Sequence, residues 1–365
     1  MHRFFIASCV SALATVPVLG QAASPPDTST TVTFSGFVDA YYAHDFGRPA
    51  DFDRSFTTQP ARHNEFNVNL AFIEARLVGP KVRGRLALQA GTSVQSNYAG
   101  EPTIGSVSGP SLSRLIQEAV AGVRLGRSVW IDGGIFFSHI GMESFISRDN
   151  LTYTRSLSAD YTPYYESGAK LTWQPSPALT ATFVVMNGWQ NISENNPDKA
   201  VGGRLDFSPD SSASFSFYSF VGKEGDPGML RILNGIGAKT IAVTGLTLQA
   251  NVDYGIQNRD NSDDSHWYSA ALIAKAQPTR FVSVAGRIER YVDPDQTMIV
   301  TQNGGKFIGT MASLGLDVSL PGADKALWRN EVRGTWTGDA VFPSRSATGL
   351  SKHNYVVVTS LALTF

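Results

Sequence analysis

Few residues of this chain combine types and spacing suited to covalent chemistry. Ser138 and His139 precede Asp160, and these three residue types together form the catalytic group of many hydrolases. Neighbouring residues of a β-strand point to opposite faces, so Ser138 and His139 cannot act as a dyad within a strand. The segment 235–240 (GIGAKT) ends like a phosphate-binding loop but lacks the preceding glycine at the required spacing. The six histidines show no spacing typical of metal ligands, so we expect no enzyme, no cofactor and no metal site.

Charged side chains instead recur at alternate positions of several segments. Alternate residues of a strand share one face, and rings of charged side chains set the selectivity of membrane pores. If these strands enclose a water-filled channel, the charges would face it and line its constriction. The alternative is that they are ordinary solvated ion pairs in a wide lumen. The candidates are Arg83, Arg85, Arg287, Glu289, Arg329, Glu331 and Arg333.

Strands that could hold these side chains are predicted by apolar residues at every second position over most of the chain. For example, Leu248 and Val252 alternate with Gln249 and Asp253, whereas helical periodicity is nearly absent. The approximate predicted strands are 33–44, 63–78, 81–95, 114–126, 128–138, 161–174, 178–189, 199–208, 212–221, 230–243, 245–257, 266–276, 279–291, 306–320, 326–337 and 353–365.

The connections between these segments alternate between long and short. A long polar segment, 45–62, is followed by the short link Gly79-Pro80, and this alternation continues along the chain. Outer-membrane barrels have short periplasmic turns and longer outer loops, whereas a soluble sandwich or propeller has no reason to alternate so strictly. We therefore predict an all-β, transmembrane, antiparallel up-and-down β-barrel of about sixteen strands.

Composition is compatible with this fold class. The chain has 34 glycines and 18 prolines, which suit turns, and 42% hydrophobic residues. Alternating strands hide transmembrane character because lipid-facing and lumen-facing residues average out. The formal net charge is −1, and without a basic patch we expect no nucleic-acid partner.

The N-terminal residues are typical of a secretory signal peptide. His2 and Arg3 precede an apolar stretch, and small residues around Ala22 offer a cleavage site. We expect removal of residues 1–22, a short periplasmic segment at 23–32 and an outer-membrane barrel at 33–365. Because the only cysteine, Cys9, lies in the signal peptide, the mature chain would contain no disulfide.

The last strand carries a pattern typical of the closing strand of a bacterial outer-membrane barrel. Tyr355 and Leu363 share one face with the terminal Phe365, and small or polar residues occupy much of the other. The alternative is a half-buried strand of a soluble sheet. We predict that Tyr355, Leu363 and Phe365 form the signal read by the barrel-assembly machinery.

Two further patterns concern the barrel wall. All six tryptophans lie near predicted strand ends, which predicts a lower girdle and an upper girdle at the two membrane interfaces. The apolar series beginning at Phe66 passes into Glu74 and Arg76, so its phase breaks at a bulge or at the lower rim. The predicted lower girdle is Trp130, Trp173 and Trp328, and the predicted upper girdle is Trp189, Trp267 and Trp336.

The longest predicted outer loop, 139–160, is rich in charged residues. By analogy with general porins of this size, we expect it to fold inside and narrow the pore, with its charges facing basic residues of the wall. The alternative is a loop that only caps the barrel. Arg148 and Asp149 are its candidate constriction residues.

Several segments resemble the putative β-barrel porin-2 family of Gram-negative outer-membrane proteins. The resemblance is densest over the first 200 residues and implies a porin-like barrel in the outer membrane, but it implies little about the solute. The segments are FSGFVDAYYAHDF (34–46), RHNEFNVNLAFIEA (62–75), RGRLALQAGTSVQSNYAGE (83–101), GGIFFSHIGMESFISRDNLTYTRSLSADYTPYYESG (133–168) and NGWQNISENN (187–196).

These patterns together predict a porin for passive diffusion of small hydrophilic solutes or ions. A substrate-selective channel would differ by saturable binding within the pore. A non-conducting adhesin or receptor would act through outer loops such as 96–113 and 338–352, with a plugged lumen. Outer-membrane lipid is the expected surrounding partner, and a homo-oligomer is compatible with a porin of this size.

Overall fold

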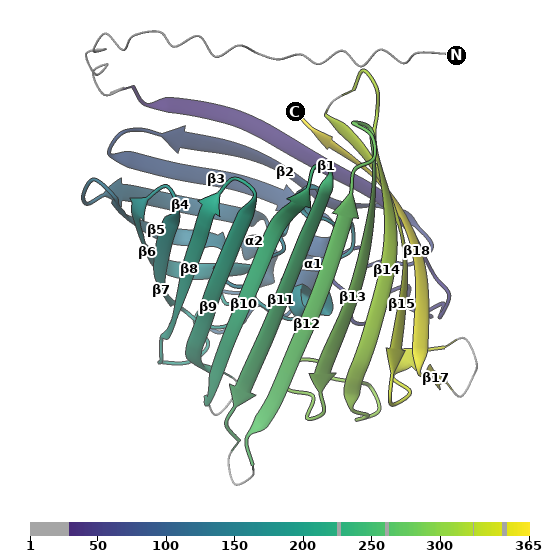
Figure 1. Ribbon diagram of the computed structural model, residues 1–365. Helices are drawn as coiled ribbons and strands as arrows, with labels where there is room; N and C mark the ends of the chain where they lie inside the picture. Colours follow the sequence, from purple (N-terminus) through teal and green to yellow (C-terminus); the bar gives the residue numbers. More distant parts are fainter. Residues whose placement is uncertain (1–28, 225–227, 260–262, 324, 345–348) are drawn as a thin grey trace, which may run out of the picture.

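Sixteen antiparallel strands close into one barrel in the computed structural model, which describes residues 29–365 except 225–227, 260–262, 324 and 345–348 (Figure 1). None of the helices among these described residues is long and apolar enough to cross a membrane. The barrel strands are β1 (Thr31–Asp45), β2 (Phe66–Val78), β3 (Val82–Ala90), β4 (Ile116–Arg124), β5 (Val129–Phe137), β6 (Tyr165–Ser176), β7 (Leu179–Met186), β8 (Ala200–Asp210), β9 (Ala213–Glu224), β10 (Met229–Val243), β11 (Leu246–Gln257), β12 (Ser265–Ala276), β13 (Val282–Asp293), β14 (Phe307–Ser319), β15 (Ala326–Thr337) and β18 (His353–Thr364). The remaining elements are α1 (Thr92–Asn97), α2 (Pro110–Ser113), η1 (Ser147–Asp149), α3 (Leu157–Asp160), β16 (Phe342–Pro343) and β17 (Leu350–Ser351).

The first and last strands close the barrel. In β1 and β18, Phe37 pairs with Thr364, and the backbone of Gly36 exchanges two hydrogen bonds of 2.9 and 3.0 Å with that of Phe365. A Cβ on residue 36 would lie 2.3 Å from the Phe365 ring, so a glycine is needed where the terminal ring crosses β1. Closure leaves the sheet without an unpaired edge.

The two ends of the barrel differ, as the connection lengths predict. Short turns join β2 to β3, β4 to β5 and the later pairs at the end where β1 begins and β18 ends, which we call the turn end (top of Figure 1). Long connections lie at the opposite end, which we call the loop end. The predicted strands match the observed ones, with the largest shifts at β3 and β6. Strand β3 stops at Ala90 because Gly91, at φ 140°, turns the chain into α1.

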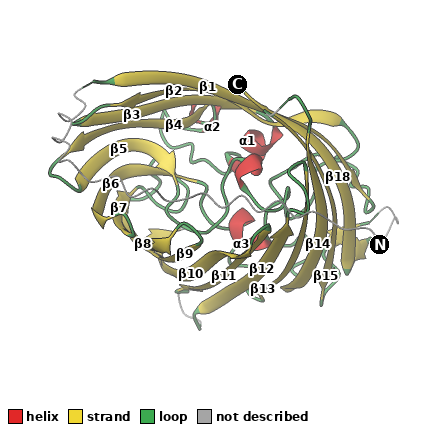
Figure 2. Cartoon of the chain, turned by 45° about the horizontal axis from the view of Figure 1, so that its top comes forward, coloured by secondary structure: helices red, strands yellow, loops and turns green. Residues whose placement is uncertain are grey.

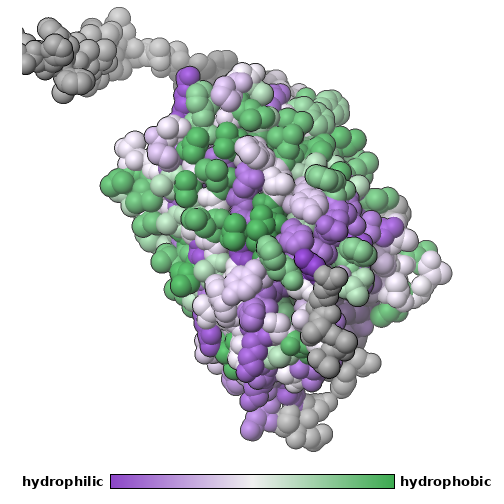
Figure 3. Space-filling model, turned by 90° about the vertical axis from the view of Figure 1, so that its right-hand side faces the viewer, coloured by the Kyte–Doolittle hydropathy of each residue, from purple (hydrophilic) through white to green (hydrophobic). Residues whose placement is uncertain are grey.

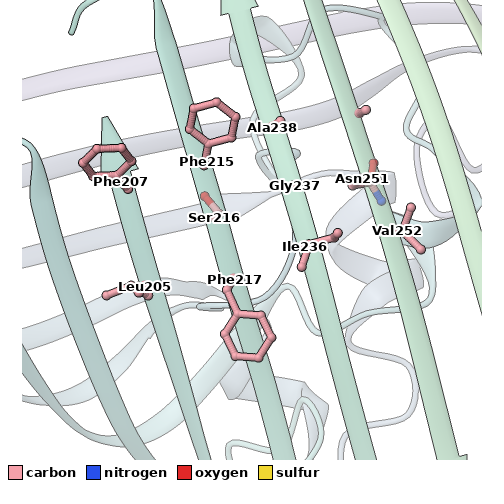
Figure 4. Close-up of a pocket in the computed structure, with 11 residues that line it drawn as sticks. Leu205, Phe207, Phe215, Ser216, Phe217, Ile236, Gly237, Ala238, Asn251 and Val252 are labelled. Atoms are coloured by element: carbon pink, nitrogen blue, oxygen red, sulfur yellow. The ribbon is translucent and has the colours of Figure 1, made fainter. Parts of the chain in front are cut away.

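The outer wall is apolar and the inner wall is polar. Leu314 is 63% exposed on the outside of β14, whereas Asp253 is buried on the inside of β11. Figure 3 shows hydrophobic side chains over much of the wall and hydrophilic ones gathered toward the loop end. On β8–β11 the outward rings of Phe207, Phe215 and Phe217 border an apolar groove of about 360 Å³ (Figure 4). This arrangement is the reverse of a soluble fold and fits a wall surrounded by lipid.

A β-bulge explains the broken phase in β2. Asp39 pairs with Leu70 and Ala40 pairs with Val68, so Asn69 is the extra residue. Phe66 therefore points outward, whereas Leu70 points inward and is buried. Of the two explanations that the sequence allows, the bulge is confirmed.

The prediction of two girdles built from all six tryptophans is wrong. Trp173, Trp328 and Trp336 are exposed on the outer wall, but Trp267 is only 1% exposed and faces the interior. Trp189 packs against Phe220 within the interior cluster, and the Trp130 ring lies 4.5 Å from the inward-facing guanidinium of Arg83. Trp267 fits inside because Gly255 pairs with it on β11, where a Cβ would lie 2.0 Å from the indole.

Candidate pore constriction

Residues 138–164, which we call the inner loop, fold into the barrel instead of capping it. Figure 2 shows α3, which belongs to this loop, and α1 within the ring of strands. Polar groups of the wall hold the inner loop on several sides. Among them, the side chains of Arg329, Arg287 and Glu331 each make two or more hydrogen bonds to it.

Arg329 on β15 binds the main chain of the inner loop. Its guanidinium is fully buried and donates to the carbonyl oxygens of Asn150 (3.1 Å), Leu151 (3.3 Å) and Ser147. The Nε atom donates to Asp317 on β14 at 2.9 Å. The arginine therefore joins two strands to the loop, and a guanidinium is suited to this because it has five donors in one plane.

Arg287 and Glu331 bind the loop at Thr154. The Thr154 backbone N–H and hydroxyl each donate to a carboxylate oxygen of Glu331 at 2.7 Å. Arg287 on β13 donates to the Thr154 carbonyl (2.5 Å), the Thr154 hydroxyl (2.8 Å) and Thr152 (2.9 Å). Its guanidinium also lies 3.5 Å from the carboxylates of Glu331 and Glu289. These charges compensate one another away from water, as buried ions require.

The beginning of the inner loop, at residues 139–141, is hydrogen-bonded to the opposite wall. Both ring nitrogens of His139 are hydrogen-bonded, one to the Glu166 carboxylate and one to the Ser219 carbonyl, each at 2.8 Å. Burial alone would lower the pKa of His139, but the Glu166 carboxylate outweighs it and raises that pKa. Arg204 on β8 donates to the Gly141 carbonyl at 2.7 Å. The inner loop thus spans the barrel between opposite walls.

The predicted site residues divide into three groups. Five of them surround the inner loop and are buried, and they are Arg287, Glu289, Arg329, Glu331 and Arg333. Arg83 and Arg85 lie apart from these, near the turn end of β3. Arg148 and Asp149 lie in η1, where Arg148 donates to the Lys325 carbonyl (2.9 Å) and the Thr364 hydroxyl (2.7 Å). Burial raises the pKa of Asp149.

The expectation that loop charges face a basic wall is only partly met. Glu143 lies 3.9 Å from Arg287, but most contacts join wall charges to backbone groups and hydroxyls of the loop. Leu157, for example, donates its backbone N–H to Glu289 at 2.8 Å. Contacts of this kind cannot be predicted from the pattern of charged residues, because the backbone groups that make them are present in every residue.

The segment 45–62 was expected as an outer loop, but the observed connection, residues 46–65, also enters the barrel. The Phe56 ring packs against Phe307 and Phe342 at centroid distances of 5.0 and 5.4 Å. Thr58 donates to Asp160 at 2.8 Å, and Gln59 donates to the Phe145 carbonyl at 3.1 Å. Three phenylalanines in this otherwise polar segment, Phe46, Phe52 and Phe56, could have indicated that it is partly buried.

Glu101 anchors a third loop, 91–115. Its carboxylate accepts the Ile192 backbone N–H at 2.6 Å, and the side chain is buried. Burial raises the pKa of Glu101 to about 7. Three loops therefore narrow the interior, and two of them were not predicted to do so.

The predicted assembly residues lie at the barrel seam. Tyr355 and Leu363 point outward from β18, and the Phe365 ring covers Gly36 at the turn end. Among the described residues, no group of three or more His, Cys, Asp or Glu side chains is arranged to hold a metal ion.

A closed sixteen-strand barrel with an apolar outer wall, a charged inner wall and an inserted loop is the architecture of an outer-membrane porin. Residues 31–365 match the family described as putative beta-barrel porin-2, OmpL-like, and the chain belongs to this family. No curated protein matches the chain.

Solved structures share the fold at low sequence identity. The anion-selective porin from Comamonas acidovorans is 12% identical, with a TM-score of 0.60 over 92% of this chain and 100% of that chain. The outer membrane channel DcaP of Acinetobacter baumannii is 11% identical, with a TM-score of 0.61 over 94% of this chain and 100% of that chain. Salmonella typhi OmpF, in complex with daunomycin, is 12% identical, with a TM-score of 0.57 over 92% of this chain and 97% of that chain.

Proposed function

We propose that this porin lets small hydrophilic solutes cross the outer membrane by passive diffusion. The observation that carries the proposal is the inner loop, which crosses a polar interior and is bound to the wall by charged side chains. A barrel of sixteen strands without such a loop encloses a wide aqueous channel. The loop would reduce this channel to a constriction that admits only small solutes.

The residues proposed for the constriction act in two ways. Arg287, Glu289, Arg329, Glu331 and Arg333 would set its width by holding the inner loop. Arg83 and Arg85 would contribute to the charge of the channel wall, because they lie away from the loop on the inner wall. No step requires a cofactor or covalent chemistry.

A substrate-selective channel is the second candidate. The three loops and the buried wall charges occupy much of the interior, and a narrow, charged path favours selection among solutes. Transport that saturates with solute concentration would distinguish this channel from simple diffusion.

Export and assembly follow from the same proposal. Residues 1–22 would be removed as a signal peptide, although they lie outside the described residues, and 23–32 would stay in the periplasm. The turn end would face the periplasm, and the loop end would face outward. Tyr355, Leu363 and Phe365 would present the closing strand to the barrel-assembly machinery, and the barrels would be free to associate as homo-oligomers in outer-membrane lipid.

Liposome swelling tests the proposal. Proteoliposomes containing the refolded mature protein should swell in sugar solutions at rates that fall steeply with sugar size. Empty liposomes and liposomes with heat-unfolded protein are the controls. No swelling with any sugar, from protein shown to be folded, would contradict the proposal and favour an adhesin or receptor.

A further inference from the structure

A cavity of about 420 Å³ lies at the turn end, on the inner wall formed by β2–β7. We call it the turn-end chamber. Four cations line it, together with two carboxylates, and these residues are Arg76, Arg83, Arg85, Lys170, Glu118 and Asp132. Its volume is within the range of pockets that hold small molecules.

Two of the four cations are committed to ion pairs. Arg83 makes a two-pronged contact with Asp132, in which the Nε atom lies 2.6 Å from Oδ1. Arg85 is bound by Glu74 on one side and Glu118 on the other. The three carboxylates near the chamber are therefore occupied by two arginines.

Arg76 and Lys170 have no ion-pair partner among the described residues. Arg76 is exposed and pairs directly across the sheet with Arg85, whose own charge is balanced by Glu74 and Glu118. Lys170 pairs across the sheet with Asp132, but that carboxylate turns to Arg83. The Lys170 ammonium instead lies 4.4 Å from the centre of the Phe136 ring, which positions it without neutralising its charge.

Because Glu74 and Glu118 already balance Arg85, Arg76 and Lys170 are the cations of the chamber that no carboxylate of the described residues binds. An anion in the cavity would accept from the donors that Arg76 and Lys170 leave unused. Guanidinium groups bind oxyanions with two hydrogen bonds, and an ammonium adds a point charge.

From this geometry we infer that the turn-end chamber binds small oxyanionic solutes, with Arg76 and Lys170 as the residues that determine this specificity. The inference rests on the proposed channel, because it concerns which solutes that channel favours. The preference would be for compact carboxylate- or phosphate-bearing solutes over neutral ones of equal size.

The test compares the wild-type protein with the double variant Arg76→Glu/Lys170→Glu, using succinate and inorganic phosphate as probes. In planar bilayers, each probe should reduce the chloride current of the wild-type protein in a saturable manner. The double variant should need a probe concentration at least about tenfold higher for half-maximal block. The reversal potential in a salt gradient should shift toward cation preference in the double variant.

A matched control is Lys199→Glu/Lys223→Glu. It changes the net charge by the same amount, but both lysines are 51% exposed at the loop end and paired with surface carboxylates. This control should leave the block by both probes unchanged. If it matches the effect of the chamber variant, only the overall charge matters and the inference is wrong.

Two further measurements keep the outcomes separate. Calorimetric titration of succinate or phosphate into the detergent-solubilised protein reports binding without requiring conduction, so a silent protein that binds either probe contradicts only the proposed channel. Current without block, and without binding, contradicts only the chamber.

If the double variant does not fold, Arg76→Gln and Lys170→Met provide milder tests, with the heat-dependent shift in gel mobility as the check on folding.

Discussion

Thr154 of the inner loop donates both its backbone N–H and its hydroxyl to Glu331 on β15, each at 2.7 Å. The carboxylate is buried, and the two hydrogen bonds join a loop to a strand 177 residues away in the chain. The width of the proposed constriction therefore depends on one side chain of the wall as much as on the loop itself.

Replacing this carboxylate should widen the pore. In Glu331→Gln an amide cannot accept both hydrogen bonds in the same geometry, and Arg287 loses one of its compensating charges. We expect a free energy of unfolding lower by about 2 kcal/mol and a larger, noisier single-channel conductance. Glu194→Gln, at a loop-end surface ion pair, is the control and should change neither. An unchanged conductance in Glu331→Gln would show that the loop does not limit the pore.

The η1 turn should also influence conduction. Arg148 ties the inner loop to the closing strand through Thr364, so Arg148→Ala should let this part of the loop move. Asp149→Ala removes the neighbouring charge. We expect conductance to change in both variants and ion selectivity to change most in Asp149→Ala. If conductance and selectivity both stay fixed, η1 is not part of the constriction.

Loop 91–115 should loosen as pH rises. Because the folded protein holds the pKa of Glu101 near 7, above its ordinary 4.5, ionisation of this carboxyl is disfavoured in the folded state. Its stabilising contribution is complete below about 4.5 and is lost as pH increases through about 7. The thermal unfolding midpoint of the wild type should therefore fall relative to Glu101→Gln over this range. A constant difference between the two proteins would contradict the assignment.

Gly255 should resist substitution. A methyl group there would lie 2.0 Å from Trp267, whose ring fills the interior beside it. We expect Gly255→Ala to lower the free energy of unfolding by about 1–3 kcal/mol through overpacking, measured by urea unfolding in detergent. Gly126→Ala is a suitable control, since no atom lies within 4 Å of the added carbon. Equal stability of the two variants would mean that Trp267 moves aside freely.

The strands were predictable because every one of them separates two different environments. In β11, apolar residues such as Leu248 alternate with polar ones such as Asp253, as expected for a wall that is apolar outside and polar inside. In β2, the bulge at Asn69 interrupts the same pattern. The prediction placed Trp267 in the upper girdle, but its ring fits in the interior because Gly255 pairs with it on the neighbouring strand. The pairing register of two strands cannot be determined from the sequence of one strand. The folding of residues 46–65 into the barrel depends on contacts such as Phe56 with Phe307, which join segments about 250 residues apart.

The inward orientation of the candidate residues was predictable, but their arrangement around the inner loop was not. Alternation correctly placed Arg287, Glu289, Arg329, Glu331 and Arg333 on the inner wall. It could not separate them from Arg83 and Arg85, because both groups share the same inward periodicity. The separation arises from where the inner loop meets the wall, and that loop binds mainly through backbone groups that have no sequence signature.

Single-channel recording of the refolded mature protein in a planar bilayer tests the central claim most directly. We expect stable, discrete current steps, with a conductance below that of a sixteen-strand barrel lacking an inserted loop, and a defined reversal potential in a salt gradient. A protein that is demonstrably folded and inserted but passes no current would contradict the porin function and leave a plugged, adhesive or receptor barrel.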